Sequence, residues 1–457
     1  MRIKQTNRHP AKSPWSKKFQ AAALLSVAMT AVVLSGCSSS TTSTPSASST
    51  SVASAPGTAD SGTINWWASP ITSSGADPRT VLIAAFEKAY PNIKVNLISA
   101  PTDTDTNRAT LTTQISGGAG PDVYMGDVIW PAQFAAHQLA VPLSQYLPSS
   151  YFDTFAPGLA AGATYKGQVY GAPFFEDQGF LYYRKDLLAE NNMKVPTTWE
   201  ELMADSKAIQ AKGQAQYGYV FQGASYEGAT CNFMEFLTDA GGTVLNSDST
   251  SSTINSAAAL KALTFQQQLV TSGVSPKAES TYQELQAMNE FSAGNSVFLR
   301  NWDYGYSTSQ APGSAVIGKV GVAPMPTFEG QPTPGYSNIG GWNLYVNPHS
   351  KNVAADLTFI KWMTGNDAQN TLATQFSEIP TNQAVRQSPD VIKSNAVLAV
   401  VPQTKLIARP AQTPFYPQVS TAIYTNVSAV LSGSMTPAAA LKAAESAINT
   451  ALSGGGL

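Results

Sequence analysis

Two blocks of alternating strand and helix patterns place the strongest limit on how this chain can fold. In the first block, strand patterns at 63–67 and 93–98 flank a helical pattern. Asp77 followed by Pro78 is typical of a helix N-cap and first turn. Because parallel strands need a crossover connection of this kind, the block indicates a β-α-β unit.

The second block begins with a helix marked by Thr198 and Glu201, which occupy the two positions of a capping box. A strand pattern at 217–223 follows, and helical patterns continue to about residue 294. The chain has 457 residues, of which 43% are hydrophobic, so each block can build its own core. We therefore expect two α/β lobes.

The first 36 residues are typical of an export signal. Six basic and no acidic residues precede or flank an apolar stretch at 19–34, which is shorter than an ordinary membrane span. The sequence Leu-Ser-Gly-Cys at 34–37 resembles the lipobox of bacterial lipoproteins, although a chance cysteine after an ordinary signal peptide is the alternative. The resemblance implies cleavage after residue 36, acylation of Cys37 and a flexible Ser/Thr-rich tether at 37–61, anchored to the cell membrane on its extracytoplasmic side.

The charge of the mature chain argues against two classes of partner. Without residues 1–36 the chain keeps 21 basic and 29 acidic residues, a formal charge of −8. This balance disfavours nucleic acid and anionic lipid as direct partners. Because acylation would occupy Cys37, Cys231 has no disulfide partner and is expected to be a small buried side chain.

Motifs for metals, nucleotides and catalysis are few. His137 and His349 stand in unrelated contexts, so neither a metal site nor a cofactor is expected. Residues 313–320 match the glycines and lysine of a phosphate loop, but Val320 replaces the magnesium-binding Ser or Thr.

One enzymatic alternative stays open. A glycoside hydrolase holds two carboxylates across a sugar bond, and Asp127 with Asp177 could supply them. The sequence contains nothing that places these two carboxylates together.

The stretch 297–306 begins as a buried strand and continues with aromatic residues. If the chain stays extended, Asn301 and Asp303 face away from the aromatic row, because side chains alternate across a strand. The opposite face then carries four side chains: Arg300, Trp302, Tyr304 and Tyr306. Such a row either packs a core or holds a ligand.

Six segments together resemble one family. Residues 62–450 resemble carbohydrate-class solute-binding lipoproteins of ABC importers, closest to the trehalose/maltose-binding branch. The resemblance is carried by residues 121–135, 170–188, 217–242, 290–306, 319–326 with 340–346, and 408–420. It implies a type II periplasmic-binding-protein-like fold that holds a disaccharide in the cleft between two lobes. The partners it implies are the transmembrane permease subunits, and the receptor is expected to be a monomer.

The family pattern also implies where the lobes begin and end. One lobe takes 62–174 plus 326–377 and the other takes 178–322 plus 383–457. Three hinge crossings then fall near residues 175–177, 323–325 and 378–382.

Sugar recognition needs carboxylates and arginines for the hydroxyl groups and aromatic rings for the apolar ring face. The family pattern assigns these roles to Asp127, Asp177, Trp302, Tyr304, Gly341, Trp342 and Arg409. Further candidates are Glu176 in place of Asp177, Arg108, Tyr226 and Glu227.

For several of these positions, a purely structural role without ligand contact is the alternative. Asp127 could be the N-cap of a helix. Gly341 could belong to a plain turn, and Tyr226 with Glu227 could cap a helix. The loop at 68–78 departs from the family because it has no glutamate. This departure leaves one of the two sugar subsites unassigned. A binding lipoprotein for a non-sugar ligand is a further alternative.

Overall fold

The structure of the protein is a computed structural model that describes residues 61–71, 76–394 and 396–454. The predicted signal peptide, Cys37 and the tether up to residue 60 lie outside the described residues. The described residues all belong to one compact unit. Among the helices described there, none combines the length and the apolar character needed to cross a membrane.

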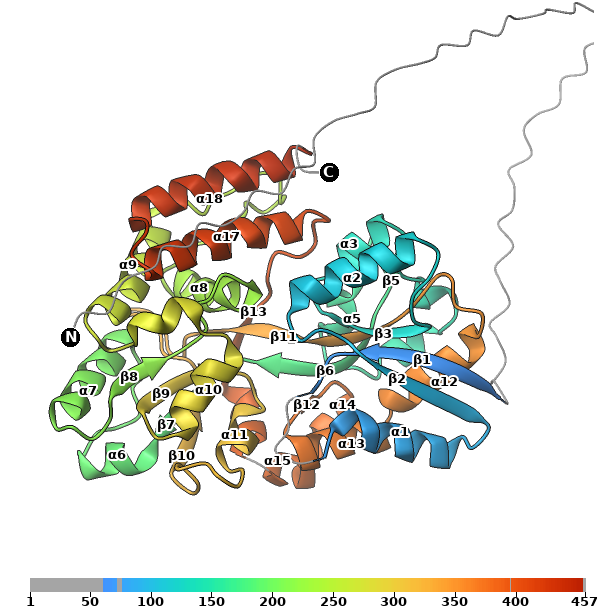
Figure 1. Cartoon of the computed structure of the whole chain (residues 1–457), viewed down its shortest axis with the longest axis horizontal. Coiled ribbons are helices and arrows are strands. Elements are labelled where there is room, and N and C mark those ends of the chain that lie inside the picture. The colour runs from blue at the N-terminus through green and yellow to red at the C-terminus, as the bar shows by residue number, and fades with distance from the viewer. Residues whose placement is uncertain (1–60, 72–75, 395, 455–457) are drawn as a thin grey trace, which may run out of the picture. The chain divides into compact units, whose positions relative to one another are not determined.

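The larger sheet has seven strands in the order β12-β6-β11-β3-β1-β2, with β13 paired to β11 (Figure 1). Its strands are β1 Gly62–Ala68, β2 Ile93–Ser99, β3 Val123–Asp127, β6 Ala172–Gln178, β11 Tyr336–Val346, β12 Ile379–Pro380 and β13 Lys405–Ile407. Strand β1 is parallel to β2 and β3, whereas β11 is antiparallel to β3 and β6. The predicted β-α-β unit is confirmed at β1 and β2.

Four main helices pack against this sheet: α1 Pro78–Ala89, α2 Thr104–Ser116, α3 Pro131–Ala136 and α12 Val353–Met363. Asp77 caps α1 as predicted, since its carboxylate accepts a hydrogen bond from Arg79 N at 2.9 Å. Trp66 on β1 is fully buried and meets Phe174 and Phe359 edge-on, at 6.2 and 5.2 Å between ring centroids. These contacts tie β1, β6 and α12 into one core.

The second sheet has four strands in the order β10-β7-β9-β8. Its elements are β7 Phe180–Arg184, β8 Tyr217–Val220, β9 Ser296–Asn301 and β10 Val320–Ala323, with α7 Trp199–Ala211, α8 Glu227–Asp239, α9 Ala257–Thr271, α10 Glu284–Ser292, α11 Gly305–Ser309, α17 Tyr416–Leu431 and α18 Pro437–Leu452. The predicted capping box at α7 is confirmed: Thr198 Oγ1 accepts from Glu201 N at 3.1 Å, and Glu201 Oε2 accepts from Thr198 N at 3.2 Å. Helices α7, α8, α9, α17 and α18 share one core with β7 and β9.

The remaining short elements connect these layers. They are β4 Thr164–Tyr165, β5 Gln168–Val169, α4 Ser149–Phe152, α5 Leu159–Gly162, α6 Lys185–Glu190, α13 Asn366–Thr371, α14 Gln383–Arg386, α15 Pro389–Ser394 and α16 Ala396–Val400, with single helical turns at Leu143–Gln145, Lys277–Thr281, Leu372–Phe376 and Val401–Gln403. Residues of α14, α15 and α16 pack with β7, β9 and α10 in a separate core.

At one of the places where the chain passes between the two sheets, a single residue joins them. Strand β6 ends at Gln178 and β7 begins at Phe180, so the chain crosses through Gly179 alone. A Cβ atom on Gly179 would lie 2.6 Å from both Arg300 Nη2 and Glu235 Oε1. The backbone at this crossing therefore packs directly against the buried ion pair that these two side chains form. The predicted lobe boundaries and the number of crossings stay predictions.

Asp356 should make the stability of the protein depend on pH. Burial, together with the nearby charge of Asp122, raises the pKa of this carboxyl to about 7, although Ser350 donates a hydrogen bond to it. The folded state then keeps a proton that the unfolded chain releases near pH 4. The stabilisation is therefore complete below pH 4 and is lost as the pH rises to about 7.

Urea unfolding at pH 5 and pH 8 measures this effect. We expect Asp356→Asn to reduce the loss of unfolding free energy between these pH values by about 2 kcal/mol. Substitution of the exposed Asp390 with asparagine should leave the pH dependence as in the wild type. An unchanged slope in Asp356→Asn would show that this carboxyl is ionised in the folded protein.

Candidate functional site

A cavity of about 360 Å³ opens where the carboxyl end of β3 meets β6, β11 and the start of α8. In open α/β folds this end of the strands is where ligands bind. Nine of the eleven predicted ligand-binding residues line it: Asp127, Asp177, Tyr226, Glu227, Trp302, Tyr304, Gly341, Trp342 and Arg409. Segments far apart in the sequence therefore converge on one space.

Asp127 is the last residue of β3 and points into the cavity. Its carboxylate accepts hydrogen bonds from Thr104 Oγ1 and from Ile129 N, both at 3.2 Å, and from Arg409 Nη2 at 3.0 Å. Helix α3 begins at Pro131 with Trp130 as its N-cap, so the alternative role of Asp127 as a helix cap is wrong.

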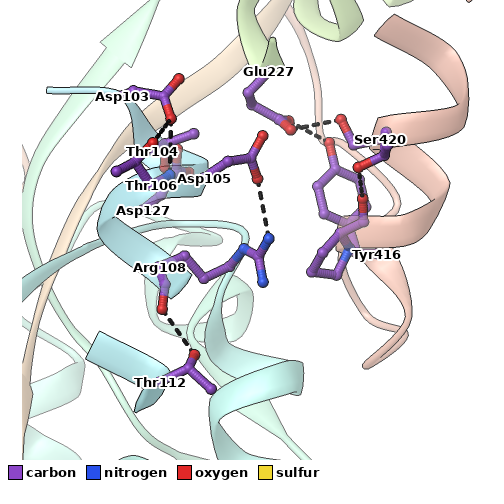
Figure 2. A network of polar contacts seen from close by, with 12 residues as sticks. Asp103, Thr104, Asp105, Thr106, Arg108, Thr112, Asp127, Glu227, Tyr416 and Ser420 are labelled. Atoms are coloured by element: carbon purple, nitrogen blue, oxygen red, sulfur yellow. Dashed lines mark hydrogen bonds and ion pairs between the residues drawn. The ribbon is translucent and has the colours of Figure 1, made fainter. Parts of the chain in front are cut away.

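Arg409 bridges two carboxylates. Its Nη1 donates to Glu227 Oε1 at 2.9 Å while Nη2 donates to Asp127, and its Nε has no hydrogen-bond partner among the described residues. Glu227 also accepts from Tyr416 and Ser420 on α17, at 2.5 and 2.6 Å (Figure 2). The guanidinium is thus held in place with one donor group still free.

The helix-cap alternative for Tyr226 and Glu227 is also wrong. Tyr226 is the N-cap residue of α8, but its side chain caps no backbone amide. Glu227 is the first residue of the helix and directs its carboxylate to Arg409, Tyr416 and Ser420 instead. Burial raises the pKa of the Glu227 carboxyl, and the Arg409 charge opposes that shift.

The aromatic wall of the cavity is built on an ion pair. The Trp302 ring stacks on the Arg300 guanidinium, with the carbon Cζ 3.9 Å from the ring centroid. Arg300 is fully buried and is held by Glu235 and by Gln222, which accepts from its Nη1 at 3.1 Å. One face of the indole therefore rests on Arg300, which fixes the ring at the cavity wall.

Strand β9 ends at Asn301, so the prediction of an extended face running on to Tyr306 is wrong. Residues after Trp302 turn into α11, and Arg300 packs behind Trp302 instead of beside it. Asp303, which was predicted to face away from the aromatic row, is fully buried and lies close to Asp177. Because the chain turns after β9, the alternating orientation of side chains in an extended strand does not continue past Asn301.

Gly341 has a positive φ of +111° within β11. A Cβ atom there would lie 2.5 Å from Phe175 O and 2.8 Å from Glu176 Cα. This position is therefore no plain turn, and glycine is needed for the close approach of β11 to β6.

We expect Gly341→Ala to lower the unfolding free energy by about 3 kcal/mol, because both the positive φ and the steric clash oppose the substitution. Gly330→Ala is the matched control, since Gly330 also has a positive φ of +83° but open space around it. The control should cost about 1 kcal/mol. Equal losses in urea unfolding would mean that the contact with β6 imposes no constraint.

Two predicted residues do not line this cavity. Glu176 points to the opposite face of β6, as successive strand residues must, and pairs there with Arg386. Arg108 pairs with Asp105 one turn earlier on α2, at 3.2 Å (Figure 2). Each side chain has its ion-pair partner outside this cavity, and contact of either one with a ligand stays a prediction.

Several lining residues were missed by sequence reasoning. Glu284 at the start of α10 lies 3.4 Å from Trp302 Nε1, and Glu378 enters from the turn before β12. Neither stands in a local motif, and only packing in three dimensions brings them to the cavity. Cys231 is a buried free thiol as predicted, and it also lines this cavity; burial raises its pKa to about 12.

Asp177 is the most perturbed carboxyl of the predicted site. Burial raises its pKa to about 7, and the neighbouring charges of Asp127 and Glu176 add to this shift. Six carboxylates line the cavity in the part of the chain that the structure describes, against the single guanidinium of Arg409: Asp103, Asp127, Asp177, Glu227, Glu284 and Glu378. The space suits a ligand rich in hydrogen-bond donors.

A second cavity of about 550 Å³ lies on the other face of β6, where Glu176 and Arg386 meet. Its wall is mostly aliphatic and includes Leu159, Ile379 and Leu406. Although it is larger, it lacks the aromatic wall and the convergent carboxylates. We therefore assign the candidate ligand site to the smaller cavity.

Comparison with known proteins agrees with this architecture. The chain is 36% identical over 362 residues to a "Probable ABC transporter-binding protein" of Deinococcus radiodurans. The aligned region covers 77% of this chain and 85% of the relative. Maltose-bound MalE3 of T. maritima is 32% identical with a TM-score of 0.78, over 84% of this chain and 98% of that one. The GacH receptor of Streptomyces glaucescens, solved unliganded and with acarbose, is 25% identical with a TM-score of 0.76, over 86% and 99%.

The predicted type II periplasmic-binding-protein-like fold is confirmed by these structural matches. A family model described as bacterial extracellular solute-binding protein matches residues 55–370, which is more than half of the chain. The chain therefore belongs to the family of bacterial extracellular solute-binding proteins.

Proposed function

We propose that the protein is the extracytoplasmic sugar-binding receptor of an ABC importer and captures an α-linked disaccharide of the maltose or trehalose type. The observation that carries this proposal is the Trp302 ring fixed at the wall of a cavity lined by carboxylates. An indole covers the C–H face of a pyranose, and carboxylates accept the protons of its hydroxyl groups. Relatives that bind maltose and acarbose support the same ligand class.

Arg409 adds the complementary donor. Arg409 lines the cavity and has N–H groups beyond the two that bond Asp127 and Glu227, so it can donate to a sugar hydroxyl without breaking those bonds. The predicted lobes would then close on the sugar, because Asp127 belongs to one lobe and Glu227 to the other. The closed receptor delivers the sugar to the permease, held at the membrane by acyl chains on Cys37.

Calorimetric titration of the purified protein with maltose, trehalose, sucrose and maltotriose tests the proposal. We expect a disaccharide to bind with a Kd in the micromolar range or below, which corresponds to about −8 kcal/mol. If none of these sugars releases heat or raises the melting temperature, the sugar assignment is wrong. Chromatography of the bound sugar after incubation should return it intact; hydrolysis would favour a glycosidase that uses Asp127 and Asp177.

A further inference from the structure

Three carboxylates from separate segments meet beneath the candidate ligand site. Asp177 comes from β6, Asp303 follows β9, and Glu378 precedes β12. One oxygen from each residue lies within 4.8 Å of the other two. The exposed fractions are 8%, 0% and 1%, and Asp177 and Glu378 reach the cavity wall. The cluster is therefore buried and yet adjacent to the space where a ligand binds.

Most oxygens of this cluster lack a hydrogen-bond donor. Both carboxylate oxygens of Glu378, and Oδ1 of Asp177 and of Asp303, have no hydrogen-bond partner among the described residues. Asp303 Oδ2 accepts from Ile379 N at 3.1 Å. Buried carboxylates without donors or cations are costly, so this arrangement is stabilised either by protons that the carboxyl groups share or by a cation.

The neighbouring guanidinium groups are already paired. Arg300 is held by Glu235, Arg386 by Glu176, and Arg409 by Asp127 with Glu227. None of the ion pairs among the described residues involves Asp177, Asp303 or Glu378. Among the described residues, no side-chain cation therefore neutralises the cluster.

We propose that Asp177, Asp303 and Glu378 bind one calcium ion at the floor of the cavity. Calcium takes oxygen ligands at about 2.4 Å, so two ligands on opposite sides of the ion stand about 4.8 Å apart. All three carboxylates fit within that span. A donor set of oxygen alone, without nitrogen or sulfur, suits calcium rather than zinc or copper.

The cluster offers four oxygens without hydrogen-bond partners, whereas calcium takes six to eight ligands. Water or hydroxyl groups of the ligand complete the coordination on the cavity side, where Asp177 and Glu378 form part of the wall. This last step rests on the proposed function. The ion would then hold the sugar against the Trp302 wall, and sugar affinity would depend on calcium.

No sequence motif indicated this site, and we expected no metal. The three residues are more than 70 positions apart at the closest, and none stands in a motif with metal-ligand spacing. The turn after β9 and the pairing of β12 with β6 bring them together.

Calcium titration of the whole purified protein, treated first with EDTA, tests the proposal without any sugar. We expect calcium to raise the melting temperature with a Kd of about 1 mM or tighter, and terbium to show luminescence excited through the adjacent Trp302. Magnesium should be at least tenfold weaker, because it requires shorter bonds and near-octahedral geometry. No response to 10 mM calcium, or an equal response to magnesium, would overturn the assignment.

Glu378→Gln and Asp303→Asn should weaken calcium binding at least tenfold. Both variants are expected to fold, because each removes one negative charge from a buried cluster and keeps the side-chain shape. Glu284→Gln is the matched control, since it removes a carboxylate from the same cavity but outside the cluster. A calcium response that persists in Glu378→Gln would place the ion elsewhere and overturn the proposal.

Sugar titrations in calcium and in EDTA then separate the two proposals. Calcium binding without any sugar binding would support the metal site and contradict the proposed receptor function. Sugar binding of equal affinity in calcium and in EDTA, with no calcium response, would overturn the metal site alone; the three carboxylates would then share protons.

Discussion

Replacing Arg409 with alanine is expected to abolish sugar binding and to lower the unfolding free energy by about 3–5 kcal/mol. The guanidinium is buried and pairs with Asp127 at 3.0 Å and with Glu227 at 2.9 Å. Its removal leaves two buried carboxylates without their cation, which is the costly way to break a buried ion pair. The cavity also loses its one cationic donor among the described lining residues.

Two further variants test whether sugar binding depends on the guanidinium at position 409 or only on a positive charge near β6. Arg409→Lys keeps the charge but cannot donate to both carboxylates in a fork, so it should recover part of the stability and little of the sugar affinity. Arg386→Ala removes an arginine that pairs with Glu176 on the opposite face of β6. This control should bind sugar as the wild type does. Urea unfolding and calorimetry measure both quantities, and wild-type affinity in Arg409→Ala would contradict the proposed site.

Local sequence signals predicted the local structure well. Asp77 caps α1 and Thr198 with Glu201 forms a capping box, because these bonds involve residues two or three positions apart. The strand patterns at 63–67 and 93–98 correctly located β1 and β2 for the same reason. Each of these features depends on neighbours in the chain, and the sequence contains all of them.

Features that depend on packing were predicted less well. The strand that begins at Ser296 ends at Asn301, so the row of side chains expected up to Tyr306 does not form, and Asp303 is fully buried. The choice between Glu176 and Asp177 was left open, because it depends on which face of β6 turns to the cavity. Arg108 lies outside the cavity and pairs with Asp105 on the same helix, which a loose family match did not indicate.

Side chains behind the cavity wall, which no sugar would contact, support the site. Arg300 and Glu235 form a fully buried pair that supports Trp302 on one side and the Gly179 crossing on the other. Asn338 N donates to Glu235 at 3.1 Å, so β11 is attached to the same pair. The wall of the cavity and the link between the two sheets therefore share one support.

Replacing Trp302 with alanine should weaken sugar binding by about 2–3 kcal/mol, or roughly 30- to 150-fold, which is typical of a buried tryptophan anchor. The indole has one face against Arg300 while its ring lines the cavity, so truncation removes the surface on which a pyranose ring stacks. Trp302→Phe keeps an aromatic face and should lose less than half of that binding energy.

Stability distinguishes this role from ordinary core packing. Trp362→Ala is the matched control, because Trp362 packs against Phe86 on α1, with ring centroids 5.6 Å apart, and does not line the cavity. The control should lower the unfolding free energy by about 2–4 kcal/mol and leave sugar affinity unchanged. Trp302→Ala should show the opposite balance, since one side of its ring faces open space. If both variants lose stability alike and neither loses affinity, Trp302 belongs to the core and the ligand stacks elsewhere.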